Sequence, residues 1–417
     1  MAIPSSMNKI GSFVFENCSS LTSVYIPSSV KSIGEKSFYG CSSLTSVTIP
    51  SKVTNIGAEA FENCSSLTSV TINSNVIISK DYVYDYYEYF DGNTHEVITV
   101  YPNNLRTIFG NQVNYYIIGE GVTSIGEGVF SHSEGLISVS IPSSVTRIDE
   151  YAFCDCSSLT SMTISSSVTH IGKYAFDQCP NLICVTINSD AVVSRGEDEP
   201  NGDDDYNMYF NTIFGHQVRL YIIGEGVTRI GSYAFSGCSG LTSVTIPSSV
   251  TSIGQYAFDG CSDLTSLTIP EGVTNIGNYA FEYCTGLTSV TLPSGVTRIG
   301  KYAFYDCSGL TSVYCHIATP LAIDSETFTN RAKATLYVPY GCKSAYQNAY
   351  CWEEFKEIVE MEDTGGSSGI STNIAAPDKG DIRVFGVNGQ PQPAMRSGLN
   401  IIRMSDGTTR KIIGQGH

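Results

Sequence analysis

The sequence predicts a repeat solenoid, a stack of coils with about 23 residues each. Two observations carry this prediction. One apolar residue, here called the marker, recurs at intervals of 23 residues in eleven of thirteen cases, and Pro, Gly, Ala-Phe and Cys recur in register with it. Each unit of such an array buries its apolar face against the next unit. The markers are Ile3, Ile26, Ile49, Ile72, Ile118, Ile141, Ile164, Ile187, Ile223, Ile246, Ile269, Leu292, Cys315 and Val338.

Each unit contains three predicted elements. Residues 241–246 alternate apolar and polar side chains, which is typical of a strand with one buried face. Residues 250–253 predict a second, shorter strand that Gly254 ends. Residues 255–261 predict a helical turn that buries the Ala-Phe pair. Stacked coils would align these apolar positions into continuous ladders.

Two coils carry insertions. Their markers are 46 residues apart (Ile72 to Ile118) and 36 residues apart (Ile187 to Ile223), although the two coils begin and end with matching sequences. The extra length lies at 80–107 and 195–212, in place of the Ala-Phe turn and ahead of the longer strand.

This pattern resembles the BspA-type leucine-rich repeats, whose consensus L-x-x-I-x-I-P-x-x-V-x-x-I-G-x-x-A-F-x-x-C carries the same residues in register over residues 2–340. The resemblance implies an arc of about 13–14 turns over residues 1–338, with parallel strands on its concave face. It also implies a protein that is secreted or attached to the surface of a bacterium, notably one of the Bacteroidetes. Family members include adhesins that bind host matrix or plasma proteins or other bacteria.

Beyond the last marker, residues 339–362 predict a C-terminal helical cap. Large apolar residues recur there at helical spacing, and a solenoid needs such a cover over its last coil for solubility. These residues are Tyr346, Trp352, Phe355 and Ile358.

A Gly/Ser linker is predicted at 363–372 and a small β tail domain at 373–417. Residues 381–387 and 399–404 predict strands, and 405–409 predict a tight turn. The tail resembles the short C-terminal domains that direct secretion or attachment of Bacteroidetes exported proteins.

The composition excludes several kinds of partner. A formal net charge of −17 would be repelled by nucleic acid and by anionic membranes. No apolar run approaches the ~20 residues of a transmembrane helix. The N-terminal residues lack the basic flank and apolar core of a signal peptide, so we expect none in this sequence.

Nine of the fourteen Cys residues recur at the Cys position of the repeat. Side chains in a ladder point the same way, which holds their Cβ atoms too far apart for a disulfide, so we expect free thiols that fill the core. Cys315 replaces a marker Ile and is expected there too, whereas Cys342 and Cys351 are the pair best placed for a disulfide. The nine are Cys18, Cys41, Cys64, Cys156, Cys179, Cys238, Cys261, Cys284 and Cys307.

No motif predicts catalysis, and we expect a protein that is not an enzyme. The six His residues make no metal-binding spacing with Cys, Asp or Glu, and P-loop, zincin and Gly-x-Ser-x-Gly motifs do not occur. Asp198, Asp203 and Asp205, in an acidic run with Asn and Gly, are a candidate Ca²⁺ site. A solvated acidic loop is the alternative, and no other cofactor is expected.

The exposed side of the longer strands is the expected binding surface. In regular coils the residues one and three before the marker are Ser or Thr, so this side is rich in hydroxyl groups. It suits a protein or a glycan, and a solvated face without a partner is the alternative. These residues are Ser46, Thr48, Ser69, Thr71, Ser161, Thr163, Ser243, Thr245, Ser266, Thr268, Ser289 and Thr291.

The inserted coils place Tyr115 and Ile117, then Leu220 and Ile222, at the same positions. Tyr-rich insertions lie beside them, and Tyr gives a binding surface large contact area with few rotatable bonds. The alternative is that the insertions fold back and bury their Tyr residues against these apolar stripes. The Tyr residues concerned are Tyr82, Tyr84, Tyr86, Tyr87, Tyr89, Tyr206 and Tyr209.

Together these observations favour a surface or secreted adhesin. Its partner would be a host extracellular-matrix or plasma protein, or another bacterial surface protein. The alternative is a surface protein that binds polysaccharide through its hydroxyl-rich face. A further row of Tyr residues before the Ala-Phe pairs is expected on the outer surface. It consists of Tyr151, Tyr174, Tyr233, Tyr256, Tyr279 and Tyr302.

Overall fold

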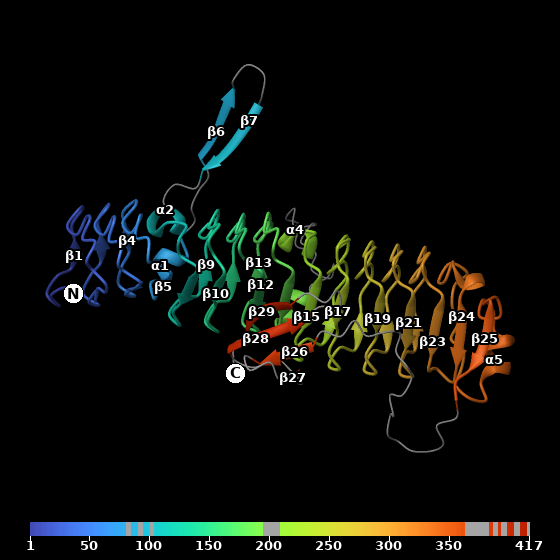
Figure 1. Ribbon diagram of the computed structural model, residues 1–417. Helices are drawn as coiled ribbons and strands as arrows, with labels where there is room; N and C mark the ends of the chain where they lie inside the picture. The colour runs from blue at the N-terminus through green and yellow to red at the C-terminus, as the bar shows by residue number, and fades with distance from the viewer. Residues whose placement is uncertain are drawn as a thin grey trace. The chain divides into compact units, whose positions relative to one another are not determined.

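The structure, a computed structural model, describes residues 1–80, 104–194 and 209–362 in full and the backbone of six further strands. The chain divides into two compact units, Met1–Glu362 and Asp363–His417. The first unit is a parallel-strand solenoid of about 14 coils stacked along one axis (Figure 1), which confirms the predicted fold class.

The longer strands of successive coils form a parallel ladder. They pair one repeat apart, with Ser46 opposite Ser69 and Ile49 opposite Ile72, and their alternate residues are buried. The ladder comprises three sheets, with the orders β10-β8-β5-β3, β12-β14-β15-β17 and β19-β21-β23-β24-β25. Its strands are β3 (Ser46–Ile49), β5 (Ser69–Ile72), β8 (Tyr115–Ile118), β10 (Ser138–Ser140), β12 (Ser161–Ile164), β14 (Cys184–Ile187), β15 (Leu220–Ile223), β17 (Ser243–Thr245), β19 (Ser266–Thr268), β21 (Ser289–Leu292), β23 (Ser312–Cys315), β24 (Thr335–Val338) and β25 (Glu357–Glu360).

The shorter strands form a second parallel ladder that is interrupted twice. Its sheets have the orders β1-β2-β4, β13-β11-β9 and β16-β18-β20-β22. At both interruptions a short helix of an inserted coil, α1 (Asn75–Ile78) or α3 (Asp190–Val193), replaces the strand. The shorter strands are β1 (Lys9–Ile10), β2 (Ser32–Ile33), β4 (Asn55–Ile56), β9 (Ser124–Ile125), β11 (Arg147–Ile148), β13 (His170–Ile171), β16 (Arg229–Ile230), β18 (Ser252–Ile253), β20 (Asn275–Ile276) and β22 (Arg298–Ile299).

These two helices are joined to the next coil through their first residue. The Asp190 Oδ1 atom accepts hydrogen bonds from the Thr228 backbone N at 2.7 Å and from the hydroxyls of Thr228 at 3.0 Å and Ser194 at 2.7 Å. In α1 the Asn75 Oδ1 atom accepts from the Thr123 backbone N at 2.9 Å. The side chain at this position therefore supplies the coil-to-coil bond that the missing strand would have made.

The segment around each Ala-Phe pair is not helical, which corrects the prediction of a helical turn. Tyr256 has φ +53°, and alternate backbone N–H groups donate to the next coil, for example Phe258 N to Ala280 O at 2.8 Å. A helix would direct these N–H groups into its own turn, so the coil-to-coil bonds decide the conformation.

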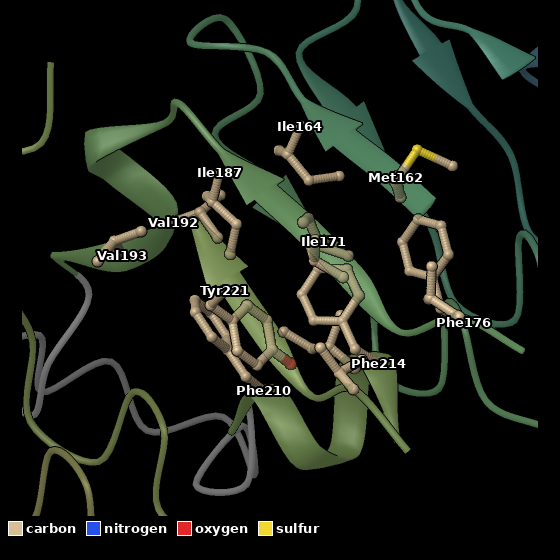
Figure 2. Packing of buried hydrophobic residues seen from close by; sticks show 14 of the residues in the cluster. Met162, Ile164, Ile171, Phe176, Ile187, Val192, Val193, Phe210, Phe214 and Tyr221 are labelled. Carbon is tan, nitrogen blue, oxygen red and sulfur yellow. The ribbon is translucent and has the colours of Figure 1, made fainter. Parts of the chain in front are cut away.

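True helical turns occur here only in the inserted coils, as α2 (Leu105–Phe109) and α4 (Phe210–Phe214). Residues four apart on a helix share one face, and α4 uses such a pair to reach both neighbouring coils. Phe214 stacks on Phe176 with ring centroids 5.0 Å apart, while Phe210 meets Phe235 edge-on at 4.7 Å. Figure 2 shows Phe210 and Phe214 with Tyr221 in this cluster. The insertion thus leaves the core continuous.

The repeat Cys residues are free, as predicted, and all but Cys18 are buried. Seven of them donate to the carbonyl of a Phe in the preceding coil; Cys284 Sγ, for instance, lies 3.2 Å from Phe258 O. Cys315 is buried. Cys342 and Cys351 are also free, so the candidate disulfide is not formed. Instead Cys351 is buried in the turn before Trp352.

The cap over the last coil is not one helix, which corrects a second prediction. Residues 343–347 form the short helix α5 (Lys343–Gln347), and β25 then adds a parallel strand beside β24. Trp352 is fully buried and its Nε1 donates to Leu321 O at 2.8 Å. A strand wins here because it pairs the backbone groups that β24 would otherwise expose at its edge.

Backbone pairing is also defined outside the fully described ranges. Within the first insertion, β6 (Asp85–Phe90) and β7 (His95–Val100) form an antiparallel hairpin. In the second unit, β26 (Arg383–Gly386), β27 (Pro391–Gln392), β28 (Gly398–Arg403) and β29 (Thr409–Gly414) form an antiparallel sheet in the order β27-β26-β28-β29. The expected β tail therefore has strands at both predicted places; most of its predicted turn lies outside the described residues.

Candidate functional site

The exposed side of the longer strands, here called the strand face, carries few charged residues. From β3 to β24 none of the residues one or three before a marker is charged. The predicted Ser and Thr residues lie there, exposed or half-buried. Within the described chain, none of those hydroxyls in the regular coils bonds to protein, so they are available to solvent or to a partner.

The first inserted coil breaks this face with an exposed apolar patch. Tyr115 is 38% exposed and Ile117 is 47% exposed. They lie between serines and threonines, because Tyr115 pairs with Ser69 on one side and Ser138 on the other. Their neighbours Tyr116 and Ile118 point into the core. The described part of the chain does not cover this patch.

The second inserted coil forms a weaker patch. Leu220 and Ile222 lie on the strand face as predicted, but both are half-buried. Cys184 lies beside Leu220 in register and is nearly buried. Burial raises the pKa of the Cys184 thiol to about 11, so it stays protonated and apolar at neutral pH.

Three aromatic residues of the strand face were missed in the sequence. Tyr314 and Tyr337 stack on adjacent strands with ring centroids 4.6 Å apart, and Tyr337 pairs in register with Val359. Tyr25, in the second coil, is 64% exposed. Each precedes a marker, so the rule that located Tyr115 and Ile117 also locates them when it is applied to every coil.

The predicted Tyr residues of the insertions are only partly placed. Tyr86, Tyr87 and Tyr89 lie on β6, opposite β7. Tyr209 precedes α4 and packs on Tyr233, with ring centroids 5.6 Å apart, so this residue belongs to the Tyr row of the turns. The remaining three predicted residues, Tyr82, Tyr84 and Tyr206, lie outside the described residues.

The candidate Ca²⁺ ligands Asp198, Asp203 and Asp205 also lie outside the described residues, and that site stays a prediction. In the described ranges no three His, Cys, Asp or Glu residues come together as a metal site would require. None of the described helices combines the length and apolar composition of a membrane span.

The coil architecture and the open strand face define a leucine-rich-repeat solenoid. The chain belongs to the BspA-type leucine-rich repeat family, because residues 1–90, 106–196 and 215–356 match the family described as "BspA type Leucine rich repeat region", in six copies.

Among solved structures, the chain is similar to a leucine-rich repeat protein from Bacteroides ovatus, with 25% identity, coverage of 75% of this chain and 71% of that one, and a TM-score of 0.42. It is similar to a leucine-rich cell surface protein from Faecalibacterium prausnitzii, with 30% identity, coverage of 75% and 86%, and a TM-score of 0.31. It is also similar to the pneumococcal vaccine antigen PcpA, with 19% identity, coverage of 87% of this chain and 88% of that one, and a TM-score of 0.33. A search of the curated proteins finds no match.

Proposed function

We propose that this protein is a surface or secreted binding protein, an adhesin without catalytic activity that recognises a protein partner through the strand face. The supporting observation is the exposed patch of Tyr115 and Ile117, which lies between Ser and Thr residues of the neighbouring strands. Exposed apolar side chains that lie together and are rimmed by polar residues are typical of protein interaction sites. The surface location and a partner from host matrix, plasma or another bacterium follow the BspA-type family.

The chemistry of the strand face supports a partner of low charge. Tyr supplies a large apolar ring with a polar tip, which is why interfaces are rich in it. The surrounding hydroxyls can donate and accept without the desolvation cost of charged groups. The aromatic pair of Tyr314 and Tyr337 extends the contact area toward β25.

The test makes the inserted strand resemble its neighbours. In the double variant Tyr115→Ser, Ile117→Thr, β8 carries the outward-facing residues of β5 and keeps its own buried residues, so the fold is retained while the patch is lost. Partners are first identified by pull-down from serum and matrix extract, and affinity is then measured by surface plasmon resonance, starting with fibronectin and fibrinogen. We expect a loss of at least about tenfold, or ~1.4 kcal/mol. A control away from the strand face is Tyr279→Ala in the Tyr row of the turns, which should bind the partner as the wild type does.

Unchanged affinity in the double variant would remove this patch from the binding site. A deletion confined to 81–103 then tests the hairpin. That deletion spares α2, whose residues Leu105 and Phe109 belong to the core.

The alternative function is polysaccharide binding by the strand face, which the unpaired hydroxyls favour. A glycan array separates the two. Signal that the variant Ser266→Ala, Thr268→Ala weakens would support the glycan function, and a blank array would end it.

A further inference from the structure

The Tyr row of the Ala-Phe turns is interrupted at the second inserted coil. In the regular coils the rings form a stack, with centroids 4.5 Å apart for Tyr256 and Tyr279 and 4.7 Å apart for Tyr279 and Tyr302. Tyr174 stacks on Tyr151 at 5.3 Å. On its other side α4 replaces the turn, and in the described chain no second ring covers Tyr174.

A groove of about 610 Å³ opens at this interruption, between the coil of Tyr174 and the end of α4. Such a volume is within the range of small-molecule sites. Tyr174 is 39% exposed, whereas the other predicted members of the row are half-buried. The groove is lined chiefly by Tyr174, Asp177, Gln178, Asn211, His216 and Gln217.

Some hydrogen-bond acceptors of the groove have no donor in the described chain. In the described chain the Asp177 carboxylate has no hydrogen bond or ion pair, and Asn211 Oδ1 is buried without a partner. His216 Nδ1 lies 3.1 Å from Gly237 O. Because a carbonyl only accepts, Nδ1 carries the proton and Nε2 of the neutral ring is left as an acceptor.

We infer that this groove binds a pyranose ring of a neutral glycan. Sugar hydroxyls would donate to Asp177 and His216, and the C–H face of the ring would pack on the electron-rich face of Tyr174. An anionic sugar is disfavoured because no Lys or Arg lines the groove. A quaternary ammonium cation is disfavoured because Tyr174 is the one Phe, Tyr or Trp among the described lining residues, whereas sites for such cations enclose them with several aromatic side chains.

The first inserted coil lacks these features and serves as an internal comparison. There Glu59 takes the place of Tyr174, since both donate their backbone N–H to a Thr carbonyl of the inserted coil. Glu59 pairs with Lys36 at 3.2 Å. Arg106, in place of Asn211, bonds Asn111 at 3.2 Å. The site is therefore particular to the second insertion and is separate from the strand face.

The test titrates the full chain with the methyl glycosides of glucose, galactose, mannose and N-acetylglucosamine, by saturation-transfer NMR and calorimetry. We expect saturable binding of at least one. Tyr174→Ala should weaken it at least about tenfold, whereas Tyr174→Phe should retain it because the ring remains. Tyr279→Ala, which removes a ring that is stacked on both sides far from the groove, is the matched control and should bind as the wild type does.

Three outcomes would overturn the inference: no binding of any of the four glycosides, equal binding by Tyr174→Ala and wild type, or binding of choline chloride in their place. The double variant Tyr115→Ser, Ile117→Thr must bind the glycoside normally. Its behaviour separates failure of this site from failure of the strand face.

Discussion

The Phe ladder gives the sharpest prediction about stability. Phe258 is fully buried, and its ring lies 4.8 Å from Phe235 and 5.3 Å from Phe281. Burial of a Phe side chain contributes ~1.5–3 kcal/mol. A residual cavity of roughly 80 Å³ at ~24 cal/mol per Å³ adds about 2 kcal/mol to the cost of truncation. Phe258→Ala should therefore lower the free energy of unfolding by ~4 kcal/mol, within the ~3–5 kcal/mol typical of this change.

Urea unfolding of the full chain, followed by far-UV circular dichroism, measures this loss. The matched control is Phe13→Ala in the first coil, where the side chain is 50% exposed and the backbone has φ +62°. That variant should change the unfolding free energy by about 0.5 kcal/mol or less. If both substitutions cost the same, stacking of Phe between coils is not what holds the solenoid together.

Three further predictions concern the helices, the thiols and the cap. Burial tends to raise the pKa of Asp190, but the hydrogen bonds to its carboxylate lower that pKa overall. The contribution of Asp190 to stability is therefore present above its unfolded pKa and disappears as the pH falls through its lower folded pKa. Asp190→Asn, which copies Asn75, should lower the free energy of unfolding in urea by about 0.5–1 kcal/mol at pH 7 and by much less at pH 3. In the native protein a thiol reagent should label Cys18 at once and the buried repeat thiols only on unfolding, and rapid labelling of the latter would contradict their burial. Trp352→Phe should destabilise the cap by ~1–3 kcal/mol because Leu321 O loses its donor, and an unchanged melting temperature would count against this bond.

The buried and exposed positions of each coil could be predicted because every coil repeats the same pattern of apolar and polar residues. Positions such as those of Val244 and Ile253 must face inward in each unit. An apolar residue therefore recurs there every 23 residues, and this recurrence identifies the position as buried from the sequence alone. The same rule located the exposed patch of Tyr115 and Ile117. It would have located Tyr314 and Tyr337 had the last two coils been included.

The two incorrect local predictions have one cause. The turn at Tyr256 and the cap around Ile358 both have apolar residues at spacings that a helix would use. In each case the adjacent coil has backbone groups that need hydrogen-bond partners. Bonding to those groups outweighed the preference of the segment for a helix. These competing hydrogen-bond partners belong to the neighbouring coil, so the sequence of the segment itself does not reveal them.

The sequence by itself determined the solenoid, its register and the strand face, because apolar residues recur at the buried positions of every coil. Only the tertiary structure decided how an inserted coil rejoins the core through Phe210 and Phe214, and that among the described residues Tyr174 is stacked on one side only, beside a groove. Those features depend on contacts between side chains of different coils. No single 23-residue unit contains both side chains of such a contact, so these features follow only from the packing of one coil on the next.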